Sequence, residues 1–462
     1  MLEKSGHTQS ILIILGVCIP AILSLYFITQ FGLRTIFLDE WWVVPILEPF
    51  FTGENWLPTI LVQQNEHIPV FPRLLILITA HFTSFNTFYE LFVGWIFLSL
   101  TVLIFWLLLC RTFPRERWLI VPIAWMTFTF NQYETMLWGF ASIMWHLGIF
   151  SVIATIYFLN KIENSPKSII IVIGLSIIAS FSFMIGLLLW FIGILSLRKL
   201  KSNRKLIPIF VIFGIITFVL YFMNWDFIPA LEGNEERRFA QLETVFKEPH
   251  NLAFYILIFL GNGARFLGYD LAGGELLVVT ASIGLFILSI FVLMILYFRL
   301  KLDETIKSKI APWCQIAVFG LLCAFIVGVG RLDIAVWQSL SSRYILLSTL
   351  FIEGTLVMTI VFLLHITRTT KTAQRRKFAK GGIICIFIFL SLFIAGGYIQ
   401  GWVQGEAFFK QISVVGGNCL LDIDNSNDEC LEILNSFDPQ IVREKAKILQ
   451  ELCLGPFSTK CN

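Results

Sequence analysis

The stretch ILIILGVCIPAILSLYFIT (residues 11–29) determines the class of the fold. It carries no charge, and a helix of about 20 apolar residues spans the hydrocarbon core of a bilayer. No small-residue cleavage site follows it, so we interpret it as a retained helix rather than a signal peptide. The rest of the chain agrees, because 57% of its 462 residues are hydrophobic and only 14% are charged. The sequence therefore predicts an all-α, polytopic transmembrane protein.

Ten further apolar runs follow the first one. The run 168–197 is too long for one helix, so we expect a hairpin that turns near Phe183 to Gly186. Residues 251–268 are expected to form an interfacial or re-entrant segment. Between the predicted outer loop 224–250 and the basic connection 299–309 the chain must cross the membrane an odd number of times, and the span 275–298 already supplies one crossing. The eleven predicted spans are residues 10–30, 88–110, 118–131, 140–160, 168–182, 184–197, 206–223, 275–298, 311–330, 344–366 and 381–400.

Basic residues predict the orientation of these spans. Five connections hold 20 of the 34 lysines and arginines. Cytoplasmic loops carry an excess of such residues, which predicts a cytoplasmic N-terminus and an extracytoplasmic C-terminus in a bacterial inner membrane. No long basic arm is present, so nucleic acid is not an expected partner. The five connections are residues 111–117, 161–167, 198–205, 299–309 and 368–380.

The C-terminal tail, residues 401–462, is expected to be a small domain outside the membrane, following the transmembrane domain of residues 1–400. Asp438-Pro439 is typical of a helix start, with apolar residues on one face at Ile441, Ile448 and Leu452. Gly455 is expected to end this helix. An oxidising compartment favours one or two disulfides among the four cysteines of the tail, which are Cys419, Cys430, Cys453 and Cys461.

Two adjacent carboxylates follow the first span directly, in FLDEWW (residues 37–42). Asp39 and Glu40 begin a loop, residues 31–87, that is too apolar to be solvated, so we expect short helices lying on the outer leaflet, including one at 71–82. The same loop contains Glu66 and His67 in QQNEHIPVFPR (residues 63–73).

The other candidate site residues fall on the same predicted face of the membrane. Charged groups are costly inside a helix span and cheaper at its ends, so each could simply be a headgroup anchor, a loop charge or a helix cap. Their convergence on one side, with acids and bases together, favours a functional site. These residues are Glu134, Trp138, His146, Arg265, Arg331, Arg343 and Tyr344.

A carboxylate at the membrane surface can act as a general base when apolar surroundings raise its pKa. Arginines nearby can hold a phosphate through two hydrogen bonds and stabilise negative charge on a leaving group. A base, phosphate-binding arginines and an apolar groove together predict transfer of a sugar from a polyprenyl-phosphate donor. Trp138 is a candidate for stacking on the sugar ring.

The acidic pair after the first span, the interfacial helices and the number of spans resemble the GT-C superfamily of membrane glycosyltransferases. LDE is the motif that matches, and NEH and SRY resemble features of related bacterial membrane proteins. The resemblance implies inverting transfer from a lipid-linked sugar to a glycan, lipid or protein acceptor, with Asp39 as base. Many members have Asp-Asp or Asp-X-Asp, whereas Glu40 follows Asp39 in this chain. This difference leaves open which acid is the base.

Alternatives remain at the level of sequence. A divalent metal, Mg²⁺ or Mn²⁺, could bind Asp39, Glu40, Glu66 and His67, since oxygen and nitrogen ligands suit such ions. The protein could also be a transporter or flippase for a lipid-linked glycan, a polymerase or ligase of such glycans, or a non-catalytic membrane subunit. Transporters commonly show repeated halves and ionisable groups near the midplane, which we do not find in the sequence.

Overall fold

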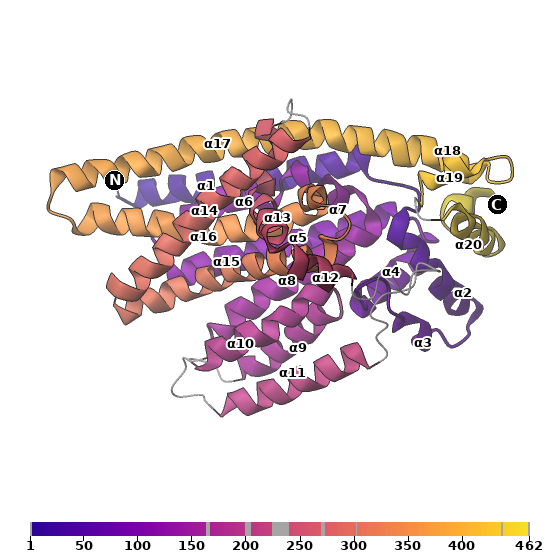
Figure 1. Cartoon of the computed structure of the whole chain (residues 1–462), viewed down its shortest axis with the longest axis horizontal. Coiled ribbons are helices and arrows are strands. Elements are labelled where there is room, and N and C mark those ends of the chain that lie inside the picture. Colours follow the sequence, from indigo (N-terminus) through magenta and orange to yellow (C-terminus); the bar gives the residue numbers. More distant parts are fainter. Residues whose placement is uncertain are drawn as a thin grey trace.

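The computed structural model describes residues 2–162, 167–198, 205–223, 240–268, 273–301, 303–435 and 438–460. Within these residues the chain forms helices and no β-strand. Seven of the helices are long and apolar enough to cross a membrane, and they lie mostly along the long axis of the molecule (Figure 1). The predicted all-α, multi-pass architecture is therefore confirmed. The seven are α1 (Leu2–Phe31), α5 (Phe88–Thr112), α8 (Gly139–Leu159), α14 (Gly274–Lys301), α15 (Glu304–Arg331), α16 (Ile345–Thr369) and α17 (Ala373–Phe409).

Four of the eleven predicted spans form helices too short to count among these seven. They are α6 (Ile120–Thr127), α9 (Ser168–Ser180), α10 (Leu188–Arg198) and α11 (Leu206–Phe222). The predicted break in 168–197 is confirmed, because the chain leaves α9 at Phe181 and passes through the 3₁₀ turn η4 (Met184–Leu187) into α10. Residues 251–268 likewise form a short helix, α13 (Pro249–Gly261), followed by the 3₁₀ segment η6 (Asn262–Gly268).

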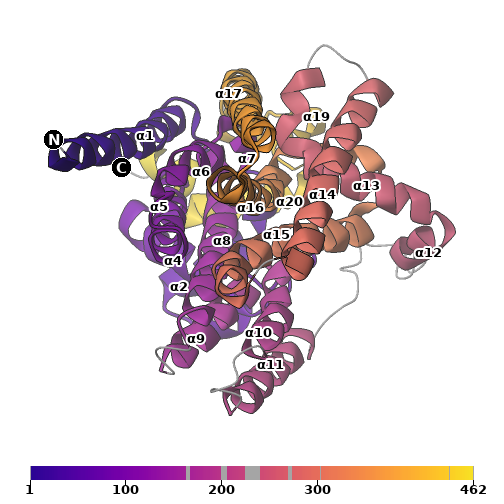
Figure 2. The same ribbon diagram turned by 90° about the vertical axis from the view of Figure 1, so that its left-hand side faces the viewer.

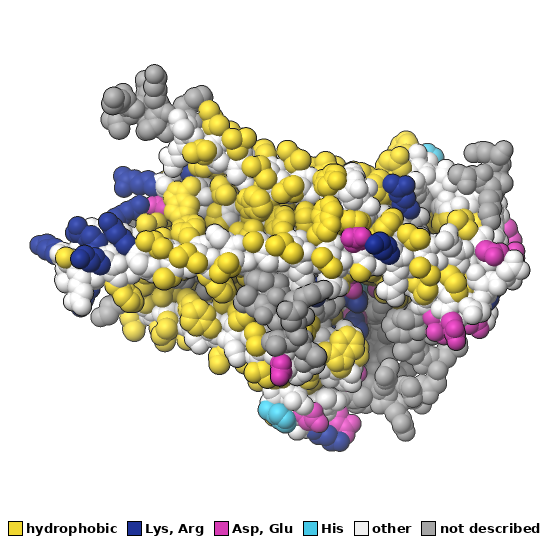
Figure 3. Space-filling view, turned by 90° about the horizontal axis from the view of Figure 1, so that it is seen from above, with side chains coloured by type: hydrophobic (Ala, Val, Ile, Leu, Met, Phe, Trp, Pro, Cys, Tyr) yellow, Lys and Arg dark blue, Asp and Glu magenta, His cyan; other side chains and the backbone are white. Residues whose placement is uncertain are grey.

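The centre of the bundle is formed by α8 and α16, whose side chains are mostly buried, whereas α1 and α14 lie at its periphery (Figure 2). Close contact between these helices depends on small residues. A Cβ at Gly94 of α5 would overlap Ser142 of α8, and one at Gly354 of α16 would overlap the backbone of Trp313 in α15. Seen from above, apolar side chains cover much of the visible face, and lysines and arginines gather at the end where α16 joins α17 (Figure 3).

The loop after α1 lies toward the opposite end of the molecule from the junction of α16 and α17 (Figure 1). It forms the expected short helices, which are η1 (Leu38–Trp42), α2 (Val44–Thr52), α3 (Leu57–Ile60) and α4 (Val70–Thr83). Leu57, Leu61 and Phe82 of this loop expose large apolar side chains, as expected for helices that contact lipid.

The C-terminal tail continues the last long helix. Residue 400 lies within α17, and the helix continues through a π-helical turn (Lys410–Gly416) into α18 (Gly417–Leu421). The helices α19 (Asp428–Glu432) and α20 (Pro439–Glu451) and the turn η10 (Gly455–Lys460) then pack beside the first long loop (Figure 1). The expected start of α20 is confirmed, since the Asp438 carboxylate accepts a hydrogen bond from the Gln440 N–H at 2.8 Å.

The predicted apolar residues of α20, Ile441, Ile448 and Leu452, all pack against the core, but the most buried line lies beside them. Its fully buried residues are Val442, Ala446 and Leu449, whereas Ile441 and Ile448 are only partly buried. Helix α20 ends at Glu451, and Gly455 follows it with a positive φ of 59°. The most buried line of residues is therefore shifted by one position toward α19 and the first loop, which α20 contacts.

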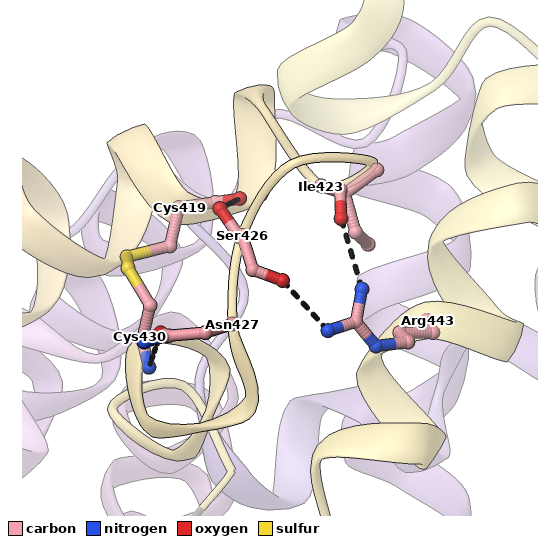
Figure 4. The surroundings of a disulfide bond; sticks show 6 residues. All are labelled: Cys419, Ile423, Ser426, Asn427, Cys430 and Arg443. Atoms are coloured by element: carbon pink, nitrogen blue, oxygen red, sulfur yellow. Dashed lines mark hydrogen bonds between the residues drawn. A yellow bond between two sulfur atoms is a disulfide. The ribbon is translucent and has the colours of Figure 1, made fainter.

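Disulfide bonding in the tail is confirmed for one pair. Cys419 of α18 is bonded to Cys430 of α19, and the guanidinium of Arg443 donates to the carbonyls of Ile423 and Ser426 in the connection between them (Figure 4). Cys453 is also disulfide-bonded, and Cys461 lies outside the described residues.

Candidate active site

A cavity of about 350 Å³ opens between the first long loop, the N-terminal part of α8, the turn η4 and the junction between α15 and α16. Seven of the eleven predicted site residues line it, although they come from widely separated parts of the chain. Its remaining wall is mostly apolar. The seven are Asp39, Glu66, His67, Trp138, Arg331, Arg343 and Tyr344.

The LDE turn points its two carboxylates in different directions. Leu38 has a positive φ of 43°, a backbone conformation that costs a non-glycine residue about 1–3 kcal/mol. Its N–H donates to the Leu434 carbonyl of the C-terminal tail at 2.8 Å, which holds the strained residue in place. As a result Asp39 faces the cavity, whereas Glu40 is fully buried against the helices behind it.

Asp39 is held by the neighbouring QNEH turn. Gln64 and His67 exchange two backbone hydrogen bonds of 2.8 and 2.9 Å, and Asn65 at the tip of the turn has a positive φ of 49°. Asparagine tolerates this conformation better than most residues. The turn brings the Asn65 amide to 3.1 Å from Asp39 Oδ1, and the Gln64 amide donates to the Asp39 carbonyl at 2.8 Å.

The surroundings of Asp39 favour its protonated form. Desolvation raises the pKa of Asp39 above its ordinary value, and the nearby charge of Glu66 adds to this. The charges of Arg343 and Arg331 and the hydrogen bond from Asn65 oppose the rise only in part. Such a carboxylate binds a proton more readily than an exposed aspartate, which is the property required of a general base.

Arg331 and Glu66 form an ion pair across the mouth of the cavity. The distance between Arg331 Nη2 and Glu66 Oε2 is 2.8 Å, and both side chains are about 30% exposed. Beside them, the His67 ring packs on Phe183, and its Nδ1 accepts a hydrogen bond from the Met184 N–H at 3.4 Å. Desolvation lowers the pKa of His67 to about 4, so this imidazole is neutral at neutral pH.

Arg343 lies on a short turn at the start of α16, the 3₁₀ helix η8 (Ser342–Tyr344). Its Nε donates to the Ser341 hydroxyl at 3.0 Å and lies 3.8 Å from Glu134 Oε2. Glu134, in the short helix α7 (Tyr133–Leu137), contacts this turn rather than lining the cavity. Desolvation alone would raise the pKa of Glu134, but the Arg343 charge and hydrogen bonds from the turn lower it below its ordinary value.

The apolar wall consists of aromatic and aliphatic side chains. The rings of Trp145 and Phe183 have centroids 4.2 Å apart, and Trp145 also approaches Tyr344, at 6.0 Å. Met144, Met184, Ile185, Phe222, Ile326, Val327 and Val329 extend this wall from α8, η4, α11 and α15. A ligand with one anionic group and one apolar part would match the two sides of the cavity.

Glu40 anchors the LDE turn instead of lining the cavity. Its carboxylate accepts the N–H groups of Phe37 at 3.3 Å and of Phe140, near the N-terminus of α8, at 3.2 Å. Burial raises the pKa of Glu40 to about 8, and Glu90 of α5 lies beside it. A Cβ on Gly139 would lie 2.7 Å from Glu90 Oε2 and 3.0 Å from Glu40 Oε1, so this close packing requires a glycine.

Two other predicted site residues lie away from the cavity. His146 is buried in α8, where its Nδ1 is 3.3 Å from the Ser142 hydroxyl. Arg265 donates to the Leu340 carbonyl at 2.8 Å and lies over the Tyr133 ring. The Arg265 contact joins η6 to the 3₁₀ helix η7 (Val336–Leu340), whereas the His146 contact lies within α8. Among the described residues no three acidic, histidine or cysteine side chains form a group that could hold a metal ion.

Sequence reasoning missed several residues that support the site. Asn65 lies between Gln64 and Glu66 in QQNEH (residues 63–67), and the preference of asparagine for tight turns could have identified it. Arg73 is buried and donates to the Ile60 and Val62 carbonyls and to Gln64 Oε1, at 3.0, 2.5 and 3.1 Å. Nothing in its local sequence distinguishes Arg73 from a headgroup anchor.

No protein-family model matches this sequence, and no curated protein is significantly similar to it.

Proposed function

We propose that the protein is a membrane glycosyltransferase. It moves a sugar from a polyprenyl-phosphate donor to an extracytoplasmic acceptor, with inversion at the anomeric carbon. The observation that supports this proposal is the cavity itself, in which a desolvated carboxylate and two arginines stand at one side of an apolar wall. The GT-C resemblance of LDE and of the first loop supports it independently.

The proposed mechanism assigns a role to each charged side chain. Asp39 takes the proton from the acceptor hydroxyl as its oxygen attacks the anomeric carbon. The bond between that carbon and the phosphate oxygen breaks, and the lipid phosphate leaves with the electron pair. Arg343 and Arg331 neutralise the charge that develops on it. The apolar wall, including Phe183 and Trp145, accommodates the isoprenoid chain next to the phosphate.

The contacts of the two arginines leave room for a phosphate group to bind them. Among the described residues, Asp39 forms no ion pair with either arginine, although all three side chains line the cavity. A phosphate could bind the terminal nitrogens of Arg343 while its Nε keeps its contacts with Ser341 and Glu134. At Arg331 it would compete with Glu66, whose ion pair is partly exposed and therefore weak.

The orientation of the membrane is part of the same proposal. The basic connections would lie in the cytoplasm, and the cavity and disulfide-bonded tail would lie outside, in the envelope of a bacterium. In this orientation Asp39 meets an acceptor that is already outside, such as a glycan, a glycolipid or a protein.

Transfer of a radiolabelled sugar from a panel of polyprenyl-phosphate donors in membranes tests the proposal. Wild-type protein is compared with Arg343→Gln, Arg331→Gln and, as a control, Arg299→Gln at the far basic end. We expect each site variant to raise the donor KM at least tenfold, because a charge-assisted bond to phosphate is lost, and the control to leave it unchanged. Wild-type protein that transfers no sugar from any donor in the panel would contradict the proposal.

A further inference from the structure

Three donors converge on one carboxylate oxygen behind the cavity. Glu134 Oε2 accepts hydrogen bonds from the Ser342 hydroxyl at 2.7 Å, from the Ser341 hydroxyl at 3.0 Å and from the Arg343 N–H at 3.0 Å. The Ser342 hydroxyl also lies 3.3 Å from the Glu134 N–H. Hydrogen bonds to an ionised carboxylate are about twice as strong as neutral ones, so this contact fixes the start of α16 against α7.

The same contact determines how the Arg343 side chain leaves the backbone. Its Nε donates to the Ser341 hydroxyl, which itself donates to Glu134, and its backbone N–H donates to Glu134 directly. Arg343 is therefore held both at its backbone and at its Nε. The two terminal nitrogens of Arg343 make no hydrogen bond with any residue that the structure describes. Because Arg343 lines the cavity and is about 30% exposed, these nitrogens are available to a ligand there.

We propose that Glu134 is a positioning residue, which holds the Ser341–Arg343 turn so that the free end of Arg343 faces Asp39 and an anionic ligand group. Glu134 itself does not touch the ligand. The assignment of phosphate as that group depends on the proposed function, whereas the effect of Glu134 on Asp39 does not.

The link to Asp39 is electrostatic. The charged groups that act on Asp39 are Arg343, Arg331 and Glu66. His67, which is neutral at neutral pH, and Tyr344 line the same cavity. Among the influences that lower the pKa of Asp39, the charge of Arg343 is the largest. An Arg343 side chain that is no longer held would spend less time near Asp39, and the carboxylate would then keep its proton at higher pH.

Labelling of Asp39 with an apolar carbodiimide measures this effect without turnover. The reagent modifies protonated carboxyl groups, and peptide mass spectrometry follows the extent of labelling as a function of pH. We compare the full-length wild-type protein in detergent with Glu134→Ala, Glu134→Gln and Ser342→Ala. Glu48→Ala, which removes an exposed carboxylate of α2, is the control.

We expect Glu134→Ala to shift the labelling midpoint of Asp39 to higher pH and to raise the donor KM about tenfold, the effect of one lost bond to a charged group. Glu134→Gln should retain most wild-type behaviour, because its amide oxygen can still accept the same donors. A Glu134→Ala protein with the wild-type midpoint would overturn the proposal.

Two further outcomes are distinguished from a failure of this inference: a variant that does not fold, and a wild-type protein that transfers no sugar. If Glu134→Ala does not fold, Ser342→Ala removes one of the three hydrogen bonds and keeps the carboxylate, and it should shift the midpoint in the same direction by a smaller amount. An unshifted midpoint in folded Ser342→Ala would then overturn the inference. Absence of sugar transfer by wild-type protein overturns the proposed function alone, because the labelling experiment still decides the role of Glu134.

Discussion

At the scale of the residue, the adjacent carboxylates Asp39 and Glu40 differ because of their surroundings. Asp39 faces a cavity that Arg331 and Arg343 also line, whereas Glu40 accepts two backbone N–H groups in a buried position. The strained backbone at Leu38, held by Leu434, directs the two side chains apart. The difference between the proposed base, Asp39, and the buried anchor, Glu40, therefore arises from one turn of the backbone.

The raised pKa of Asp39 predicts how transfer depends on pH. A base must be ionised, so kcat/KM should fall as the pH drops through the pKa of Asp39, at a higher pH than for an ordinary aspartate. Asn65→Ala removes a hydrogen bond that favours the ionised form, and it should move this acidic limb to still higher pH. The pH profile of kcat/KM measures both effects. An acidic limb that Asn65→Ala leaves in place, or moves to lower pH, would contradict this account of Asp39.

Some of the site residues predicted from the sequence line the cavity and others do not, and the difference has a physical reason. Charged residues in the first loop, such as Glu66, and at the ends of spans, such as Arg331, were found because charged groups are easily recognised in an apolar sequence. Their pairing was not predictable, because it depends on how the first loop folds over α15. His146 and Arg265 carry the same signal in sequence, yet they lie away from the cavity. His146 contacts Ser142 of its own helix, and Arg265 donates to the Leu340 carbonyl.

At the scale of the element, the C-terminal tail acts as a support for the first loop. The Leu434 carbonyl holds Leu38, and Lys445 of α20 lies 4.3 Å from the centre of the Trp42 ring. The Cys419–Cys430 bond joins α18 to α19 just before Leu434. The sequence predicted a disulfide-bonded tail and the start of α20, but it held no signal that the tail contacts the LDE turn.

Removal of this disulfide should therefore affect the site as well as the tail. We expect Cys419→Ser/Cys430→Ser to lower the stability of the tail by about 2–4 kcal/mol, the typical contribution of a disulfide, and to reduce kcat several-fold because Leu38 loses its support. Limited proteolysis of the tail and transfer assays measure these two effects. Cys385→Ser, which changes an exposed free cysteine of α17, is the control. A destabilised tail with unchanged kcat would show that the tail does not support the site.

At the scale of the whole molecule, apolar runs predicted the membrane class but not the number of full-length spans. Hydropathy counts apolar residues, whereas the length of a helix also depends on where its backbone turns. The run at 118–131 shows this, since α6 ends at Thr127 and Thr129 accepts a hydrogen bond from the Asn131 N–H in a new 3₁₀ turn. In the same way α17 continues beyond residue 400. Gly401 and Gly405 lie within this part of the helix and do not end it, and both allow close packing, against the Phe130 backbone and the Phe27 ring respectively.

The most direct test measures sugar transfer by Asp39→Asn and Glu40→Gln in membranes with matched protein levels. Each substitution replaces one of the two neighbouring carboxylates by the corresponding amide. We predict that Asp39→Asn lowers kcat by about 10²–10⁴-fold, the usual contribution of a general base. Glu40→Gln should keep most of the activity, since its amide oxygen can still accept the Phe37 and Phe140 N–H groups. Full activity in folded Asp39→Asn, or loss of activity only in Glu40→Gln, would contradict the assignment of Asp39 as the base.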